Sequence, residues 1–298
     1  MFTGSLVALI TPFDEQGAVD IAALRKHVRF QIDKGTHGLV AAGTTGEAPT
    51  LHEREWVEVV SAVVDEADGQ LPVIAGCGAN DTRHAVQLHK QATELGANAA
   101  LHVTGYYNRP DQRGILEHYH QLSQSSELPV LIYHIPHRTG VVIELDTMLE
   151  LAQLPGVIGV KDSSQDLKRP VLESLGVTQP FACLTGEDAT AVAYNAAGGV
   201  GCISVTANVA PDLCSEMQQY CLDGDFVRAR AIQAQLMPLH QALFREPSPA
   251  GVKYAAAKLG LCLNSVRSPL LSVTAQTASH IDAALASTGL QTQVASVG

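Results

Sequence analysis

Short apolar segments rich in β-branched residues recur along most of the chain. Their side chains are apolar at nearly every position rather than at alternate ones, which is typical of parallel strands that are covered on both faces. We expect strands at Ser5–Ile10, Gly38–Gly43, Pro72–Gly76, Ala99–Thr104, Pro129–Tyr133, Val157–Lys161, Phe181–Thr185 and Gly201–Val205.

The segments between these strands have the period of amphipathic helices. Ile21–Lys34, for example, places Leu24, Val28 and Ile32 on one face, and Asp81–Leu95 opens with an Asp-Thr cap. A third helix is expected at Glu53–Ala67. Strand–helix alternation repeated eight times predicts an α/β fold, namely a (β/α)8 TIM barrel, and a doubly wound open sheet is the alternative.

After the eighth strand the pattern is helical only, from about Pro211 to Ala295. We expect residues 1–224 to form the barrel and residues 225–298 to form a C-terminal helical extension. No linker separates the two parts, so the extension is expected to pack on the barrel as one structural unit. In such barrels the chemistry lies at the C-terminal ends of the strands.

The composition narrows the class of protein. A hydrophobic share of 46% and a charged share of 16% suit a large buried core, and a net charge of −11 argues against a nucleic-acid partner. No apolar run approaches the roughly 18–20 residues of a membrane helix. The N-terminus lacks the basic start and apolar stretch of a signal peptide. We therefore expect a cytoplasmic protein without a membrane partner.

Six cysteines are spread along the chain, and no two of them form a C-x-x-C pair. Cys77, Cys183 and Cys202 lie inside apolar runs. Reduced cysteines that are buried as small hydrophobic residues are therefore expected, rather than a zinc site or a disulfide framework. The other three cysteines are Cys214, Cys221 and Cys262.

The second strand ends in the turn Gly43-Thr44-Thr45-Gly46-Glu47. Two glycines around two hydroxyl residues offer free backbone N–H groups and O–H donors, a combination that suits a carboxylate or a phosphate. An ordinary glycine-rich turn is the equal alternative. The stretch Gly76-Cys77-Gly78 lacks the third glycine of a dinucleotide fingerprint, so no nucleotide cofactor is expected.

Lys161 closes the sixth strand, which is otherwise apolar. A strand end inside a barrel is partly desolvated, which disfavours the ammonium form and frees the amine as a nucleophile toward carbonyls. The alternatives are a lysine that extends to the rim, or one that pairs with Asp162.

The fifth strand leads into a polar segment at the same end of the barrel. There Tyr133 could transfer protons, and Arg138 could bind a carboxylate in bidentate fashion. His134 and His137 are expected to be loop histidines rather than metal ligands, because no carboxylate lies near them in sequence.

Two further pairs of residues are less informative. His118 and His120, two positions apart on an expected helix, point in different directions and are expected at the surface. Tyr106 and Tyr107 follow the fourth strand, and their pattern leaves core packing, an interface or a site open.

Taken together, these stretches resemble the dihydrodipicolinate synthases, in the wider family of pyruvate-dependent class I aldolases that includes N-acetylneuraminate lyase. The resemblance runs essentially from end to end, and it singles out Lys161. The matching stretches are Gly4–Pro12, Gly43–Glu47, Ala75-Gly76, Gly78-Ala79-Asn80, Tyr106–Pro110, Pro136, Arg138-Thr139-Gly140, Lys161, Ile203–Asn208, Phe244, Glu246-Pro247 and Val252-Lys253.

The resemblance implies an imine between Lys161 and pyruvate, which loses a methyl proton to become an enamine. Tyr133 would move protons, linked through Thr44 to Tyr107, which is donated across a dimer interface. A homotetramer built from two tight dimers is the family expectation. No metal or organic cofactor is implied, because the imine is the electron sink.

The resemblance also implies the substrate contacts. Thr45, the backbone of its turn and Ile203 would hold the pyruvate carboxylate, and Gly186 would belong to the same substrate site. Arg138 would bind the carboxylate of L-aspartate 4-semialdehyde. The product would then cyclise to 4-hydroxy-tetrahydrodipicolinate, on the route to lysine and diaminopimelate.

The chain departs from the synthase pattern around the second-substrate pocket. Asp162-Ser163-Ser164-Gln165 replaces an acidic residue followed by Ala-Thr-Gly, and Gln165 could narrow the pocket. Gly105, His134 and Ser248 with Ala250-Gly251 also differ from the usual residues. The alternatives are therefore another pyruvate-dependent aldolase, acting on a 4-hydroxy-2-keto acid or a sugar acid, and a catalytically weak paralogue that binds a keto acid or an amino acid.

Lysine-sensitive relatives bind lysine at a separate site, and this site is altered here. His84 replaces a glutamate that would neutralise the ammonium group of the ligand, and Glu53 and Trp56 replace histidines. Loss of a buried charge partner is costly, so weak or absent inhibition by lysine is expected. The other matching positions are Ala48, Pro49, Asn80 and Tyr106.

Overall fold

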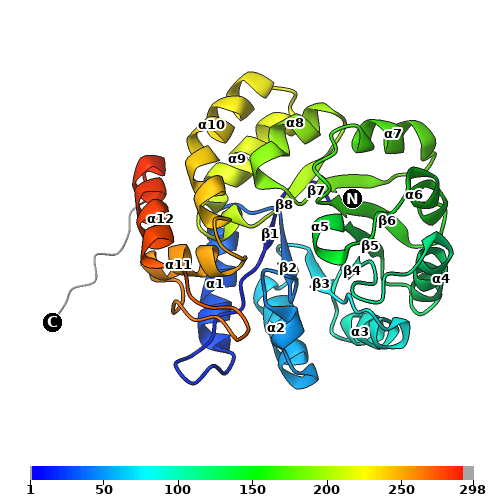
Figure 1. The fold of residues 1–298 in the computed structure, drawn as a ribbon, viewed down its shortest axis with the longest axis horizontal. Coiled ribbons are helices and arrows are strands. Elements are labelled where there is room, and N and C mark those ends of the chain that lie inside the picture. The colour runs from blue at the N-terminus through cyan, green and yellow to red at the C-terminus, as the bar shows by residue number, and fades with distance from the viewer. Residues whose placement is uncertain (1, 291–298) are drawn as a thin grey trace.

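The computed structural model describes residues 2–290 as a closed barrel of eight parallel strands that follow one another in chain order (Figure 1). β8 closes the barrel by pairing with β1. The strands are β1 (Gly4–Ala8), β2 (Gly38–Ala41), β3 (Val73–Gly76), β4 (Ala99–Val103), β5 (Val130–His134), β6 (Val157–Asp162), β7 (Ala182–Thr185) and β8 (Gly201–Ser204). The predicted TIM barrel is therefore confirmed, and the open sheet was the wrong alternative.

Helices cover the outside of the barrel, and short 3-10 helices follow three of the strands. The predicted helix Glu53–Ala67 has the same bounds in the structure, and Asp81 caps the next one by accepting a hydrogen bond from Arg83 N at 3.0 Å. The helices of the barrel layer are α1 (Ile21–Asp33), α2 (Glu53–Ala67), α3 (Thr82–Glu94), α4 (Gln112–Ser123), α5 (Pro136–Thr139), α6 (Leu145–Leu151), α7 (Arg169–Gly176), α8 (Ala191–Ala196) and α9 (Pro211–Leu222), and the 3-10 helices are η1 (Ala48–Thr50), η2 (Asp188–Thr190) and η3 (Thr206–Asn208).

The hydrophobic core has an inner and an outer part. Leu6, Ile74 and Leu184 belong to a cluster inside the barrel, whereas a larger cluster fills the space between the strands and the helices. Because successive residues of a strand point to opposite faces, each strand contributes to both parts. This explains why the strands are apolar at nearly every position.

The expectation of free, buried cysteines is confirmed for all but Cys262, whereas the expectation that His118 lies at the surface is wrong. All six cysteines are free thiols, and all except Cys262 are buried. His118, expected at the surface, is buried against α3, where its Nδ1 lies 2.9 Å from Thr82 Oγ1. Residues two apart on a helix do point in different directions, so His118 faces inward while His120 is exposed.

The chain continues beyond α9 as α10 (Phe226–Leu243), α11 (Ala250–Lys258) and α12 (Ala275–Thr288). Figure 1 shows α11 and α12 together at one edge of the barrel, and α10 contacts both α9 and α12. The last part of the expected helical region, residues 291–298, lies outside the described residues. The boundary between residues 224 and 225 remains a prediction.

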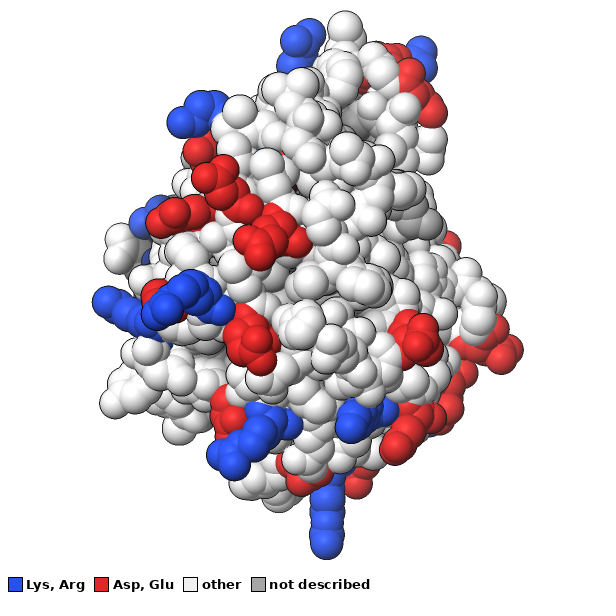
Figure 2. Space-filling view, turned by 90° about the vertical axis from the view of Figure 1, so that its right-hand side faces the viewer, with Lys and Arg blue, Asp and Glu red and all other residues white. Residues whose placement is uncertain are grey.

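The surface that carries α3, α4, α6 and α7 faces the viewer in Figure 2. Acidic and basic side chains are scattered around a broad uncharged area on this face. None of the helices within residues 2–290 has the length and apolar character needed to cross a membrane.

Candidate active site

Lys161 and Tyr133 lie next to each other at the C-terminal end of the barrel. The parallel register pairs Lys161 on β6 with Tyr133 on β5 and with Leu184 on β7. Lys161 is only 6% exposed, and its Nζ lies 4.3 Å from the centroid of the Tyr133 ring. The amine and the phenol are thus held together in a largely desolvated position.

Gly186 packs directly against the Lys161 side chain. A Cβ atom at Gly186 would lie 2.8 Å from Lys161 Cε and would also collide with Ser163 Oγ, so the position has no room for a side chain. The Gly186 N–H donates to Asp162 O at 2.7 Å, which fixes the two strand ends to each other. Gly186, predicted as a substrate-site residue, therefore lies directly beside Lys161.

The turn Gly43–Glu47 has an unusual backbone conformation. The residues at its two ends, Ala42 (φ 51°) and Glu47 (φ 57°), are both left-handed, a region that L residues other than glycine rarely adopt. Thr45 is buried, and Thr44 is half-buried. The Gly46 and Glu47 N–H groups donate within the turn, to Gly43 O and Thr44 O at 3.1 Å each, so the candidate donors to a ligand are the N–H and O–H groups of Thr44 and Thr45.

A cavity of about 440 Å³ opens beside this turn. Thr44, Tyr133 and Arg138 all line it, so residues from three separate segments meet around one space. Arg138 itself is exposed on α5, where its guanidinium can reach a carboxylate that enters the cavity. The structure therefore brings together the candidate proton-transfer residue and the candidate carboxylate-binding residue.

Ile203 on β8 is fully buried in the same interior cluster as Tyr133 and Leu184. It therefore lies inside the barrel, as a residue that contacts a substrate beside Lys161 would have to. Its strand end is held by Asp188, which is 1% exposed and accepts hydrogen bonds from Val205 N at 2.9 Å and from Thr206 N. The sequence reasoning missed Asp188, although an acidic residue two positions after Gly186 was a usable signal.

Tyr107 is the one predicted catalytic residue that does not join the others within a single chain. Its side chain is 90% exposed, and its backbone is left-handed (φ 68°). Its neighbour Tyr106 lines the cavity instead. A role for Tyr107 in the site would therefore require a second copy of the chain.

The expectation that His134 lies in a loop is wrong. It is the last residue of β5 and is 1% exposed, whereas His137 is exposed. Burial, and to a lesser degree the charge of Arg169, lower the pKa of His134 to about 3, so its ring is neutral. Within residues 2–290, no group of three or more His, Cys, Asp or Glu side chains is arranged to hold a metal ion.

Gln165, the largest departure from the synthase pattern, lies in the loop between β6 and α7. Its backbone is left-handed (φ 64°), which explains why a glycine suits this position in related chains. The exposed side chain donates from Nε2 to Glu187 Oε2 at 2.9 Å. This hydrogen bond links the loops that follow β6 and β7.

The cavity also reaches the positions that correspond to the lysine site of related chains. Glu53, Trp56 and His84 line it together with Thr44 and Tyr133. Ala48, Pro49 and Tyr106 line it as well. The Glu53 carboxylate accepts hydrogen bonds from Gln87 and Gln91 at 2.7 and 2.8 Å.

Comparison with known proteins agrees with these features. A family model described as the dihydrodipicolinate synthetase family matches residues 1–288. The 4-hydroxy-tetrahydrodipicolinate synthase of Parvibaculum lavamentivorans is 52% identical over 290 residues, which cover 97% of this chain and 99% of that protein. The synthase of Ruegeria pomeroyi is 51% identical and is covered completely, with the same share of this chain.

Solved structures of such enzymes superpose closely on the chain. The chloride-inhibited dihydrodipicolinate synthase from Acinetobacter baumannii, complexed with pyruvate, is 39% identical with a TM-score of 0.96, and the alignment covers 98% of this chain and 100% of that one. The enzyme from Cyanidioschyzon merolae with lysine bound is 31% identical with a TM-score of 0.94, covering 97% and 99%. By sequence and by structure, this chain belongs to the dihydrodipicolinate synthetase family.

Proposed function

We propose that the chain is a lyase that condenses pyruvate with L-aspartate 4-semialdehyde, through an imine on Lys161, to give 4-hydroxy-tetrahydrodipicolinate. The observation that carries the proposal is the buried Lys161 amine beside the Tyr133 ring, at the end of the barrel where such folds hold their active sites. The names of the relatives and the pyruvate complex of a structural neighbour support it.

The first half of the reaction forms the carbon nucleophile. The neutral Lys161 amine adds to the C2 carbonyl of pyruvate, and loss of water gives the imine. Tyr133, which touches the lysine, delivers and removes the protons of these steps. The hydroxyl of Thr45, the N–H groups of its turn and Ile203 hold the pyruvate carboxylate, and Gly186 belongs to the same substrate site beside Lys161. Loss of a methyl proton then gives the enamine.

The second half joins the two substrates. Arg138 binds the carboxylate of the semialdehyde, and the enamine carbon attacks the aldehyde carbon to form the new C–C bond. The aldehyde oxygen takes up a proton from Tyr133. That proton is replaced through Thr44 of the same chain and Tyr107 of a second copy. The substrate amine then attacks the imine carbon and displaces Lys161, which closes the ring. The imine nitrogen accepts the electron pair when the methyl proton leaves, and the enamine returns it to form the new C–C bond, so these steps need no metal or organic cofactor.

The proposed assembly is a homotetramer of two tight dimers in the cytoplasm. The strongly exposed Tyr107 supports the dimer, because only a second copy could cover it and use its hydroxyl in the site. Exposed apolar side chains on and beside α7 give a second surface suited to association; they are Leu167, Val171, Leu172 and Leu175. Free thiols at all six cysteines suit a reducing compartment.

A coupled assay with purified protein, pyruvate and L-aspartate 4-semialdehyde tests the proposed reaction. Turnover above about 1 s⁻¹, lost in Lys161→Ala, is the expected result. Absence of turnover while borohydride still traps pyruvate on Lys161 would contradict the proposed second substrate. That outcome would favour an aldolase acting on other 4-hydroxy-2-keto acids or sugar acids. Absence of trapping as well would favour a binding protein without catalytic activity.

A further inference from the structure

A buried ion pair joins the pyruvate-binding turn to the C-terminal extension. Glu47, the last residue of the turn, is 3% exposed, and Lys253 on α11 is fully buried. Lys253 Nζ donates to Glu47 Oε1 at 2.6 Å, and the Arg267 backbone N–H donates to Glu47 Oε2 at 2.9 Å. Both oxygens of one carboxylate are thus held by residues more than 200 positions away.

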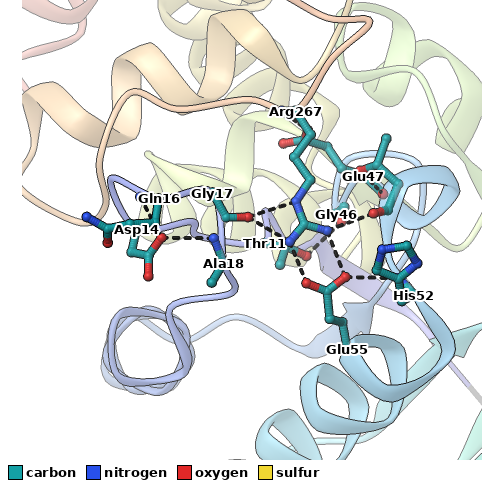
Figure 3. A network of polar contacts seen from close by, with 11 residues as sticks. Thr11, Asp14, Gln16, Gly17, Ala18, Gly46, Glu47, His52, Glu55 and Arg267 are labelled. Carbon is teal, nitrogen blue, oxygen red and sulfur yellow. Dashed lines mark hydrogen bonds and ion pairs between the residues drawn. The ribbon is translucent and has the colours of Figure 1, made fainter.

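The Arg267 side chain ties the loops on either side of this turn to each other. Its guanidinium donates to Gly17 O at 2.7 Å in the loop after β1 (Figure 3). The same group donates to Thr50 O at 2.7 Å in η1. It also donates to both carboxylate oxygens of Glu55 in the first turn of α2. The segment between α11 and α12 therefore fixes the first two loops at the active end of the barrel.

Phe13 is fully buried between the two cations. Lys253 Nζ lies 3.9 Å from the centroid of its ring, and Arg267 Cζ lies 4.3 Å from the same centroid. Both distances are within the range of cation–π attraction. The two positive charges therefore share an aromatic ring, while the Lys253 ammonium group and the Arg267 backbone N–H share the Glu47 carboxylate.

The conformation of the turn depends on such outside contacts. Glu47 has a left-handed backbone, which an L residue adopts only where surrounding structure holds it. Thr11 Oγ1, in the loop after β1, donates to Gly46 O at 2.7 Å and so holds the residue that precedes Glu47. With the carboxylate and the preceding carbonyl both fixed, the backbone N–H groups and hydroxyls of Thr44 and Thr45 are fixed in direction.

We infer that Glu47, Lys253 and Arg267 are positioning residues that set the Thr44-Thr45 turn for the keto-acid carboxylate, so that the C-terminal extension takes part in pyruvate binding. The inference rests on the proposed function. None of the three residues is expected to touch a substrate. They act by keeping the hydrogen-bond donors of the turn in place before pyruvate arrives.

The test compares pyruvate binding in variants of the buried pair with a matched surface control. Lys253→Met breaks the pair, and the double variant Glu47→Gln with Lys253→Met removes both charges while keeping similar shapes. Lys258→Met is the control, because Lys258 lies on the same helix and pairs with Asp282 at 3.3 Å, with both side chains about 40% exposed. The readouts are KM for pyruvate, KM for the aldehyde, and kcat per site that borohydride can trap.

The expected result is a KM for pyruvate raised about tenfold or more in both pair variants. Their KM for the aldehyde, and both KM values of the Lys258→Met control, should stay within about twofold of the unsubstituted chain. An unchanged KM for pyruvate in the folded double variant would overturn the inference. A merely structural role would lower the yield of trappable sites without changing that KM. If both pair variants aggregate, Glu47→Asp, which keeps the charge, is measured instead. A raised KM for pyruvate then supports the inference, and an unchanged KM overturns it. An unsubstituted chain that traps no pyruvate would instead contradict the proposed function.

Discussion

Two charged networks adjoin segments of the candidate site, and they differ in charge balance. The Glu47 network, formed by Glu47, Glu55, Lys253 and Arg267, matches two carboxylates with two cations. The Arg169 network, formed by Asp162, Arg169 and Glu173, sets two carboxylates against one guanidinium. The first network includes the last residue of the Gly43–Glu47 turn, which is proposed to bind pyruvate, and the second begins directly after Lys161.

The Arg169 network begins directly after the lysine. Asp162 follows Lys161 on β6 and points to the opposite face of the sheet, toward α7. Arg169 Nη2 lies 2.9 Å from Glu173 Oε1, whereas its Nε is 3.7 Å from Asp162 Oδ2, an oxygen that has no hydrogen-bond partner. The Cys183 thiol donates to the other oxygen of Glu173 at 3.5 Å.

The comparison shows how a matched cation and burial act on a carboxylate in opposite directions. Arg267 holds the pKa of the partly exposed Glu55 at about 2, mainly through its hydrogen bond. Burial raises the pKa of Glu173 to about 7, and the single guanidinium of Arg169 does not offset it. Glu55 therefore stays ionised at physiological pH, while Glu173 changes charge near neutrality.

The largest effect is expected from breaking the balanced network. Lys253→Met leaves Glu47 buried without its ammonium partner, so the free energy of unfolding should fall by about 3–5 kcal/mol. Urea unfolding at one fixed protein concentration measures it. Lys258→Met, which removes only an exposed pair, should change this free energy by less than about 1 kcal/mol. Equal losses in the two variants would contradict the importance of the buried pair.

Glu173→Gln should stabilise the protein, and more strongly at higher pH. The pKa of Glu173 in the folded protein lies above its ordinary value of 4.5, so its ionisation costs stability as the pH rises from about 4.5 to 7. The difference in free energy of unfolding between the variant and the unsubstituted chain should increase by about 2 kcal/mol, in favour of the variant, from pH 5 to pH 8. Urea unfolding measures it. Glu117→Gln, an exposed acid on α4, serves as the control and should show no such trend. A pH-independent difference for Glu173→Gln would disprove the raised pKa.

Glu55→Gln should show the opposite pH dependence. The pKa of Glu55 is depressed, so its contribution is present above its ordinary value of 4.5 and is lost as the pH falls toward 2. Because the pair is partly exposed, the expected loss at pH 7 is only about 1 kcal/mol, shrinking in acid. The same unfolding experiment measures it, and a loss that grows as the pH falls would be the wrong sign.

Gln165→Gly, in the loop that precedes Arg169, should slightly raise the free energy of unfolding. The left-handed φ of 64° costs a glutamine about 1–2 kcal/mol, and the extra freedom of glycine in the unfolded chain offsets part of this, leaving about 0.5 kcal/mol. Ser164→Gly, at a neighbouring position without a left-handed backbone, should instead lose stability. Losses in both variants would mean that the Gln165 hydrogen bond to Glu187 outweighs the backbone strain.

The smallest expected effect is that of lysine on the initial rate. His84 lines the cavity at the position where the family resemblance implies a glutamate. Glu53, which lines the same cavity, accepts hydrogen bonds from Gln87 and Gln91 on its Oε1, and these would have to be rearranged before that oxygen could pair with the lysine ammonium group. Weak or absent inhibition is predicted, and inhibition by sub-millimolar lysine in the coupled assay would be the contrary outcome.

Local patterns predicted the barrel well because strands and helices depend on neighbouring residues. The same patterns missed the burial of His118 and His134, since a histidine does not reveal which face of its element it occupies. They also gave no role to Lys253, although a lysine among alanines on α11 was visible. Its partner Glu47 lies 206 positions away, and such a contact exists only once the fold has formed.

The candidate site likewise contains residues that local sequence patterns placed correctly and residues that they could not place. Lys161 and Tyr133 are neighbours because two consecutive parallel strands pair them. The apolar runs placed each residue at the end of a strand, and the family resemblance linked their roles. Gly186 and Ile203 were expected from the family resemblance, and their positions inside the barrel agree with it. The role proposed for Tyr107 requires a second chain, which neither the local pattern nor one protomer can supply.

The most direct test of the account is to trap pyruvate on the enzyme. The purified chain is incubated with pyruvate, reduced with borohydride, and studied by mass spectrometry of the intact protein and of its peptides. The account predicts one reduced pyruvate per chain, attached to Lys161 and absent from Lys161→Ala. No adduct, or an adduct on a different lysine, would contradict it.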